Sequence, residues 1–161
     1  MAAARNLVHV TMLNRQRTQK LDTRRLRKIA LALLGELQIS KAELGVTFVA
    51  DKEMTLVNET FLQHEGSTDV ITFDHTLEQD SRRKATESNN GSVHGELFIC
   101  VDEAIRQAKR FRTTWHSELT RYIVHGVLHL LGHDDHRAAD RLKMKLEENR
   151  LVRKLASVIK K

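Results

Sequence analysis

Four short segments of the chain have the hydrophobic and polar pattern of β-strands. The clearest is residues 7–13, LVHVTML, in which aliphatic and polar side chains alternate. Three further runs, rich in β-branched and aromatic residues, follow at residues 45–50, 69–73 and 95–101. We therefore expect a sheet of about four strands.

Other segments carry apolar residues three and four positions apart, the spacing that predicts one buried helix face. Two of these helices span about residues 23–38 and 115–131, and a last, highly charged one spans about residues 137–155. Two shorter helices are expected to begin after Asp51 and after Asp102. The residues expected to face the core are Leu26, Ile29, Ala30, Leu33, Leu34, Leu37, Met54, Val57, Phe61, Ala104, Ile105, Ala108, Phe111, Leu119, Ile123, Val127, Leu130, Leu142, Leu146, Leu151 and Leu155.

Residues suited to helix ends stand where these helices should begin and end. Asp22 or Thr23 is the expected N-cap of the first helix, and Asp51 and Asp102 are the expected N-caps of the two short ones. Gly132 is placed to cap the C-terminus of the helix at residues 115–131.

Residues 77–92 are polar, have no hydrophobic period and contain an Asn-Asn-Gly turn signal, so we expect a mobile loop there. The chain has no internal repeat and no shift in composition that would divide it. We expect one domain over residues 1–161. Because strands and helices alternate, its class is α/β (α+β), a single mixed sheet packed with helices.

Composition narrows the functional classes. The 161 residues hold 27 Lys and Arg against 21 Asp and Glu, a net charge of +6, which is compatible with a nucleic-acid partner or with a merely basic soluble protein. Cys100 is the only cysteine, so no intrachain disulfide or CxxC zinc ribbon can form, and we expect it to be a small buried residue. Residues 1–6 have no apolar leader pattern, and no apolar run is long enough to span a membrane. We expect a cytoplasmic protein without membrane contact.

Four of the nine histidines fall within residues 125–136, HGVLHLLGHDDH. His125 and His129 are four residues apart on an expected helix, so their side chains share one face and could grip one metal ion. The chain turns after this helix, so a third ligand can come from Asp135 or His136, which leaves a position open for water or substrate. The alternative is a surface histidine cluster without a metal.

Gly126 follows His125, at the position where HExxH zinc peptidases carry the glutamate that acts as general base. A metallopeptidase-like activity is therefore disfavoured. A divalent ion can still lower the pKa of its water to about 7 and neutralise charge on a phosphate, which suits phosphodiester cleavage by a basic protein.

The segment from His125 to Asp135 resembles the HGxLHLxGxDH signature of the YbeY family of metal-dependent endoribonucleases. Asn58 and residues 67–73, STDVITF, resemble that family's Asn and TDVxSF block, and residues 95–97, GEL, resemble its GDI strand. The resemblance implies a zincin-like fold around a central metal-binding helix, one divalent ion with zinc as first choice, and cleavage of single-stranded RNA. It also implies a role in ribosomal RNA processing, namely small-subunit 3′ maturation, in ribosome quality control, and contact with ribosomal particles or proteins.

The chain departs from the family's pattern at two positions. The third metal histidine of the family corresponds to Asp135, which we prefer as ligand because a carboxylate binds zinc at a distance similar to imidazole, and His136 is the alternative. An arginine expected four residues after Asn58, where it would face the substrate phosphate, is replaced by Leu62. Arg121, one helical turn before His125, is a candidate replacement or a plain surface charge.

Several side chains near these motifs are candidates for substrate contact: His133, Thr68 and Asp69 by their position, and Phe111 and Trp115 as stacking platforms if they are not core residues. A rival function is an RNA- or ribosome-binding factor whose metal is structural, motivated by Leu62. Another is an HD-type phosphohydrolase, since His133 and Asp134 form an HD dyad, but that fold is wholly helical.

Overall fold

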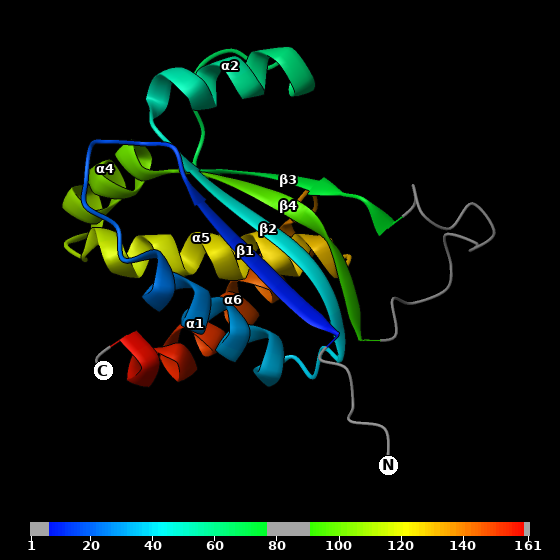
Figure 1. Ribbon diagram of the computed structural model, residues 1–161. Coiled ribbons are helices and arrows are strands. Elements are labelled where there is room, and N and C mark those ends of the chain that lie inside the picture. The colour runs from blue at the N-terminus through cyan, green and yellow to red at the C-terminus, as the bar shows by residue number, and fades with distance from the viewer. Residues whose placement is uncertain (1–6, 77–90, 160–161) are drawn as a thin grey trace.

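A computed structural model describes residues 7–76 and 91–159, and in them four strands form one mixed sheet (Figure 1). The strand order is β1 (Val8–Asn14), β2 (Lys41–Val49), β4 (Ser92–Cys100) and β3 (Val70–Asp74). The first three are parallel, and β3 pairs antiparallel with β4 at one edge. The prediction of an α/β fold with a single mixed sheet is confirmed, while one domain over residues 1–161 stays a prediction.

Helices cover most of one face of the sheet. Those on this face are α1 (Thr23–Glu36), α5 (Trp115–Leu130) and α6 (Ala138–Ile159), with α5 packed against β3 and β4 (Figure 1). Helix α4 (Val101–Phe111) follows β4 directly and packs on α5, and α2 (Asp51–Leu62) lies on the opposite side of the sheet. Among the described residues no helix is both long and apolar enough to cross a membrane.

Buried apolar and exposed polar residues alternate along β2, which explains why one face of the sheet is covered by helices and the other is open. Ala42, Leu44, Val46 and Phe48 are buried on the helix-covered face, whereas Lys41 and Glu43 on the other face are exposed. Side chains of a strand point alternately to the two faces, so one run of sequence supplies both the core and the open surface.

Two glycines let α5 approach β4 closely. A Cβ on Gly126 would stand 2.6 Å from Cδ2 of Leu97, and a Cβ on Gly95 would stand 2.6 Å from the carbonyl oxygen of Phe73 and 2.7 Å from Cδ2 of Leu130. Real Cβ atoms do not approach other atoms so closely, so larger residues at either position would push the helix away from the sheet. These contacts set the distance between the sheet and α5, the helix that carries His125 and His129.

The expected caps of the two short helices are wrong. Asp51 is the first residue of α2, after Ala50 as N-cap, and Asp102 lies in the first turn of α4, after Cys100 as N-cap. Asp102 instead serves the other helix, because its Oδ2 accepts a hydrogen bond from the backbone N–H of Asp51 at 2.8 Å. A neighbouring helix thus supplies the acceptor that a local N-cap side chain would have given.

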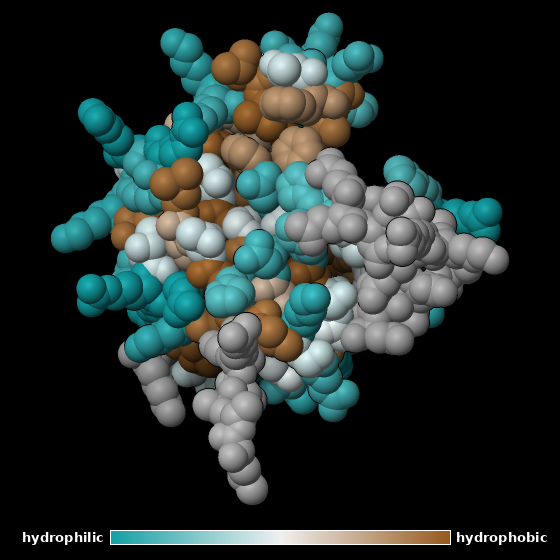
Figure 2. Space-filling view, turned by 45° about the vertical axis from the view of Figure 1, so that its right-hand side comes forward, coloured by the Kyte–Doolittle hydropathy of each residue, from teal (hydrophilic) through white to brown (hydrophobic). Residues whose placement is uncertain are grey.

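Four apolar residues that were expected to face the core are exposed: Phe61, Phe111, Leu142 and Leu146. On α6 Leu151 and Leu155 are buried as predicted, whereas Met144 and Glu148 take the inward positions that were expected for Leu142 and Leu146. On α2, which touches only part of the sheet, apolar side chains gather at the surface, as Figure 2 shows; Leu56, Phe61 and Leu62 are exposed there.

The expected loop at residues 77–92 ends earlier than predicted, because Ser92 is already the first residue of β4. Its residues 77–90 lie outside the described part of the chain.

Candidate metal centre and the α5 groove

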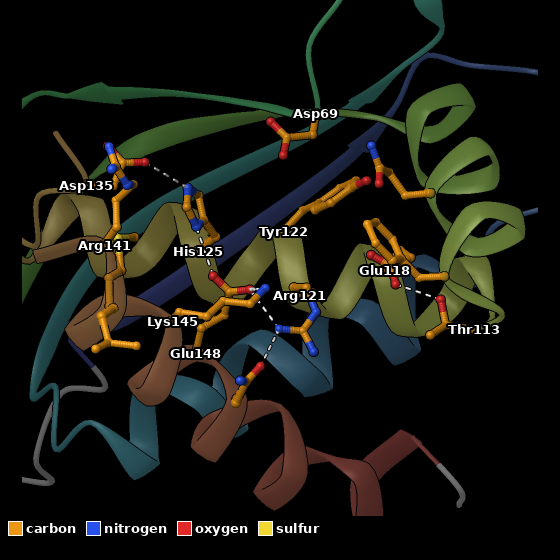
Figure 3. Close-up of a pocket in the computed structure, with 15 residues that line it drawn as sticks. Asp69, Thr113, Glu118, Arg121, Tyr122, His125, Asp135, Arg141, Lys145 and Glu148 are labelled. Carbon is orange, nitrogen blue, oxygen red and sulfur yellow. Dashed lines mark hydrogen bonds and ion pairs between the residues drawn. The ribbon is translucent and has the colours of Figure 1, made fainter. Parts of the chain in front are cut away.

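A cavity of about 780 Å³ runs along α5 between α4, α6 and the start of β3 (Figure 3). We call it the α5 groove and define it by Phe111 of α4, Tyr122 and His125 of α5, Arg141 and Lys145 of α6, and Asp69, which precedes β3. Figure 3 shows the Asp69 carboxylate on the opposite wall from α5, facing the helix. Three helices and one strand end therefore contribute to a single hollow.

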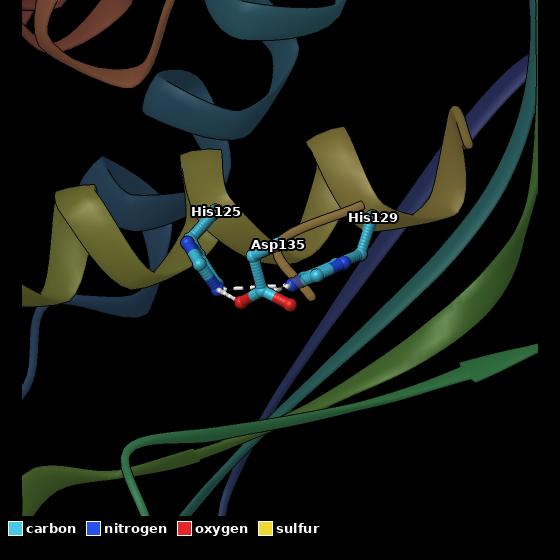
Figure 4. A group of neighbouring side chains, drawn as sticks. All are labelled: His125, His129 and Asp135. Atoms are coloured by element: carbon cyan, nitrogen blue, oxygen red, sulfur yellow. Dashed lines mark hydrogen bonds and ion pairs between the residues drawn. The ribbon is translucent and has the colours of Figure 1, made fainter. Parts of the chain in front are cut away.

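His125, His129 and Asp135 meet at one end of this groove (Figure 4). The two Nε2 atoms are 3.0 Å apart, and Oδ2 of Asp135 lies 3.9 Å from Nε2 of His125 and 3.6 Å from Nε2 of His129. Gly132, with φ +95°, lies just past the end of α5 and allows the turn that brings Asp135 back beside the helix. We call these three residues the HHD cluster.

The other nitrogen of each ring is held by an acceptor. Nδ1 of His125 lies 2.9 Å from Oε2 of Glu148, and Nδ1 of His129 lies 3.0 Å from the carbonyl oxygen of His133. A carbonyl or a carboxylate can only accept, so each Nδ1 carries the hydrogen and donates it. In the neutral rings both Nε2 lone pairs then point into the HHD cluster, as metal-ligating histidines are normally oriented.

This donor set fits a divalent cation. Two lone pairs and a carboxylate oxygen that converge on one centre repel each other unless a shared proton, as in a hydrogen bond between the two Nε2 atoms, or a metal cation lies between them. Ligands about 2.0–2.1 Å from zinc in a tetrahedral arrangement are about 3.3 Å from one another. The separations of 3.0, 3.6 and 3.9 Å in the HHD cluster lie around that value.

Glu148 is itself held in place. Its side chain is 6% exposed, and Oε1 accepts a hydrogen bond from the Arg121 guanidinium at 2.7 Å. The same Nη1 atom of Arg121 also donates a hydrogen bond to Oδ1 of Asn149 at 2.8 Å. Burial raises the pKa of Glu148, but the hydrogen bonds from His125 and Arg121 outweigh it and lower the pKa to about 2. Glu148 is therefore an anion at neutral pH.

The charge of Glu148 acts on His125 in turn. Burial lowers the pKa of His125, but the hydrogen bond and the charge of Glu148 outweigh burial, so the pKa lies above its usual value. The same contact that orients the ring also makes its Nε2 more basic, which strengthens a ligand once a cation has displaced the proton.

The remaining candidates of the histidine segment do not converge with His125 and His129, although His136 lies near Asp134 and Asp135 at the surface. The His136 side chain is 88% exposed, and its Nε2 is 3.5 Å from Asp134 rather than near His125 or His129. His133 contributes its backbone carbonyl, which holds His129, and its imidazole is not in the HHD cluster. The geometry favours Asp135 as the third ligand, which stays a proposal.

Of the other candidates for substrate contact, Asp69 lies in the α5 groove and Thr68 does not line it. Oδ1 of Asp69 accepts hydrogen bonds from the backbone of Val70 at 2.7 Å and from Oγ1 of Thr68 at 3.3 Å. Phe111 lines the groove, whereas Trp115 stacks on His116 at the start of α5. Thr68 therefore contacts Asp69 rather than the groove itself.

Arg121 is not a free surface charge, because Glu148 and Asn149 engage its guanidinium. The groove has two other cations, Arg141 and Lys145, which are exposed on α6. Arg141 donates a hydrogen bond to the carbonyl oxygen of His136 at 3.2 Å, and Lys145 donates one to Oε1 of Glu148 at 3.4 Å. Arg141 and Lys145, with Glu148 and Tyr122, were not predicted as site residues. Spacing alone does not single out Glu148, since Glu147 also lies three and four residues from Met144 and Leu151, and only the packing of α6 shows which of the two is buried.

A second group of possible ligand atoms comprises Asp51, Cys100 and Asp102. Two nitrogens of Arg106 bind the Asp51 carboxylate, each at 2.7 Å, and Asp102 accepts from the backbone of Asp51. Burial raises the pKa of the Cys100 thiol to about 11, so it stays protonated. The internal hydrogen bonds of this group explain its proximity without a cation.

Two rival functions are disfavoured by this geometry. Gly126 faces Leu97 in the core, where even a Cβ would stand 2.6 Å from Cδ2 of Leu97, so the general base of a metallopeptidase is missing at this position and has no room there. The four-stranded sheet excludes the wholly helical HD fold, and His133 and Asp134 do not share a site with His125.

Comparison with known sequences gives one family. The protein-family model described as endoribonuclease YbeY matches residues 11–156 of the chain. Proteins named endoribonuclease YbeY are similar: that of Elusimicrobium minutum is 34% identical over 124 residues, 77% of this chain and 82% of the relative. That of Syntrophotalea carbinolica is 31% identical over 145 residues, 88% of this chain and 89% of the relative. That of Parabacteroides distasonis is 37% identical over 110 residues, 68% and 69% of the two chains.

A solution structure of a protein from Thermotoga maritima has the same fold. It superposes with a TM-score of 0.62 at 22% sequence identity, and the match covers 91% of this chain and 89% of that one. At this identity the comparison supports the fold, and the sequence relatives carry the family assignment.

Proposed function

Because this chain belongs to the YbeY family of endoribonucleases, we propose that it cleaves single-stranded RNA at a divalent metal centre held by His125, His129 and Asp135. The observation that carries the proposal is the pair of tethered Nδ1 atoms, which turns both Nε2 lone pairs toward the Asp135 carboxylate. When bound, the ion supplies Lewis-acid chemistry, since it neutralises charge that develops on a phosphate and makes a water more acidic.

The chain's own residues bind the RNA backbone beside this centre. Arg141 and Lys145 line the α5 groove from α6 and are exposed, so they can reach phosphate oxygens. They supply the cations that the arginine replaced by Leu62 would have supplied. We assign them the phosphate-binding role first considered for Arg121, which is 26% exposed and held by Glu148 and Asn149, because the Lys145 side chain, although its Nζ lies 3.4 Å from Oε1 of Glu148, is 58% exposed.

Asp69 is the proposed proton acceptor for the attacking water. Val70 and Thr68 bind its Oδ1, and among the described residues no hydrogen-bond donor contacts Oδ2. Its carboxylate faces α5 across the groove (Figure 3), which places a base opposite the histidines rather than next to His125 in sequence. This position replaces the glutamate that Gly126 excludes.

The finer assignments follow from the resemblance to the family. We propose zinc as the ion, because two imidazoles and one carboxylate form a common zinc ligand set. We propose ribosomal RNA as substrate, with small-subunit 3′ maturation and ribosome quality control as the process and ribosomal particles as partners. The cytoplasm is the proposed location. The net charge of +6 is consistent with an RNA partner.

The test is cleavage of a labelled single-stranded RNA by the metal-loaded protein. We expect wild type and His136→Ala to cut, and His125→Ala and chelator-treated wild type to be inactive. His136→Ala is the matched control because its imidazole is exposed and outside the HHD cluster. If chelation abolished neither cutting nor RNA binding, the metal would have no catalytic part. If the protein binds RNA after chelation but cuts none even when it is loaded with metal, it is instead an RNA-binding factor.

A further inference from the structure

Tyr122 carries a buried hydroxyl that no partner satisfies. The residue is 4% exposed, and within residues 7–76 and 91–159 its Oη has no hydrogen-bond partner. Two other buried side-chain atoms share this condition, Oγ1 of Thr76 and Nδ1 of His94, but neither lines the α5 groove. Buried donors in native folds are almost always paired, so an unpaired one in a groove wall points to a ligand as its partner.

The position of Tyr122 relates it directly to the HHD cluster. It precedes His125 by three residues on α5, so the two side chains share one helix face about 4.5 Å apart along the axis. Stacked nucleotides advance about 3.4 Å each along a strand. A nucleotide next to the phosphate held at the HHD cluster would therefore lie beside Tyr122.

Charge divides the groove into two sides. Around Tyr122 the wall carries Asp69 and Glu118, and burial together with these carboxylates raises the pKa of the hydroxyl, so it remains a donor. Such a surface repels phosphate and accepts an uncharged group. Arg141 and Lys145 stand on the α6 side, as Figure 3 shows, where a phosphate backbone is attracted.

An exposed aromatic ring also lines the groove that carries Asp69 and Glu118. Phe111, at the end of α4, lines the groove and is 60% exposed, although helix spacing predicted it as a core residue. The guanidinium of Arg110 lies 5.4 Å from the centre of its ring. Exposed aromatic rings with arginine beside them are the surfaces on which proteins stack unpaired bases.

We propose that the part of the α5 groove between α4 and α5 is a nucleobase subsite, in which Tyr122 donates a hydrogen bond to the base and Phe111 stacks on it. The inference rests on the proposed function for the identity of the ligand as RNA. It adds a specificity element to the metal centre, because the backbone lies along α6 and the base turns toward α4.

The test compares binding of two probes to the chelator-treated protein by fluorescence anisotropy: a short labelled single-stranded RNA, and the same ribose-phosphate backbone without bases. We expect Tyr122→Phe to weaken RNA binding about fivefold and Phe111→Ala about tenfold, with binding of the abasic probe unchanged. Phe61→Ala, which removes an exposed ring outside the groove, is the matched control and should leave both affinities unchanged.

Thermal unfolding separates this role from a structural one. Because the Tyr122 hydroxyl has no partner in the free protein, Tyr122→Phe should unfold at the same or a higher temperature than wild type. Equal RNA affinity in wild type and Tyr122→Phe would overturn the proposal, and so would a lower melting temperature with equal losses for both probes. If wild type binds RNA in this base-dependent way but cuts none, the proposed catalysis fails while the subsite stands.

Discussion

Nδ1 of His125 on α5 donates a hydrogen bond to Oε2 of Glu148 on α6 at 2.9 Å, and this contact joins the HHD cluster to the one charged side chain that is buried among the described residues of α6. Glu148 is 23 residues away in sequence, so helix packing rather than local spacing brings the two together. A histidine that binds a cation through Nε2 needs such an acceptor at Nδ1 to fix its tautomer and orientation.

Replacing Glu148 with Gln should weaken metal binding. The amide keeps the shape and one acceptor oxygen but loses the negative charge that makes His125 basic, so we expect about 10–100-fold lower zinc affinity by competition with a chromophoric chelator. Glu147→Gln is the matched control, since Glu147 pairs with Arg150 on the outer side of the same helix. Equal zinc affinities of the two variants would show that the charge of Glu148 does not support metal binding.

Replacing Asp69 with Asn should slow cleavage without loss of the metal. The amide oxygen can still accept from Val70, but it cannot take a proton, so kcat should fall about 10²–10⁴-fold while KM and metal content stay near wild type. Steady-state kinetics over a range of RNA concentrations gives the two constants. A wild-type kcat in Asp69→Asn would assign the proton acceptor elsewhere.

Replacing Gly126 with Ala should destabilise the fold, because the added Cβ would stand 2.6 Å from Cδ2 of Leu97. Overpacking of this kind costs about 1–3 kcal/mol of unfolding free energy, measurable by urea titration. Gly35→Ala on α1 is the control: nothing lies within 4 Å of the added carbon, so we expect a gain of about 0.5–1 kcal/mol. If both substitutions raised the free energy of unfolding, the close packing of α5 on β4 at Gly126 would be contradicted.

The Asp51–Arg106 pair should give an acid-dependent contribution to stability. The hydrogen bond from Arg106 lowers the pKa of Asp51 from 3.8 to about 2. A carboxyl with a lowered pKa stabilises the fold above its unfolded pKa and loses that effect as pH falls through the folded one. The side chain is 42% exposed, so solvent limits the contribution to about 1 kcal/mol or less.

The free energy of unfolding of wild type and Asp51→Asn, measured at several pH values, tests whether this stabilising effect is lost as the pH falls. Wild type should be the more stable protein at pH 7, and the difference should shrink between pH 4 and pH 2. A difference that grows as the pH falls would contradict the assigned direction.

Much of the fold could be predicted because it depends on short-range patterns. Period-two alternation placed β1, and three- and four-residue spacing placed α1 and α5 within a few residues of their ends. On α6 the prediction is confirmed for Leu151 and Leu155 and wrong for Leu142 and Leu146, because the partner helices bury Met144 and Glu148 in that part of the helix. Burial there is decided by tertiary packing, which no local pattern contains.

The candidate site divides in the same way. His125 and His129 could be paired from their spacing on one helix, and the turn after Gly132 limited the third ligand to a few residues. Glu148 and Tyr122 could not be assigned, because their roles depend on how α6 and α4 lie against α5. A buried charge and an unpaired hydroxyl become visible only when neighbouring helices are in place.

The most direct test of the metal centre is the divalent metal content of purified wild type, His125→Ala, Asp135→Ala and His136→Ala, measured by elemental analysis. The HHD cluster predicts about one ion per chain in wild type and in His136→Ala, and its loss in the other two variants. Retention of the ion in Asp135→Ala together with its loss in His136→Ala would name His136 as the third ligand. No stoichiometric metal in wild type, even after reconstitution, would contradict the metal centre itself.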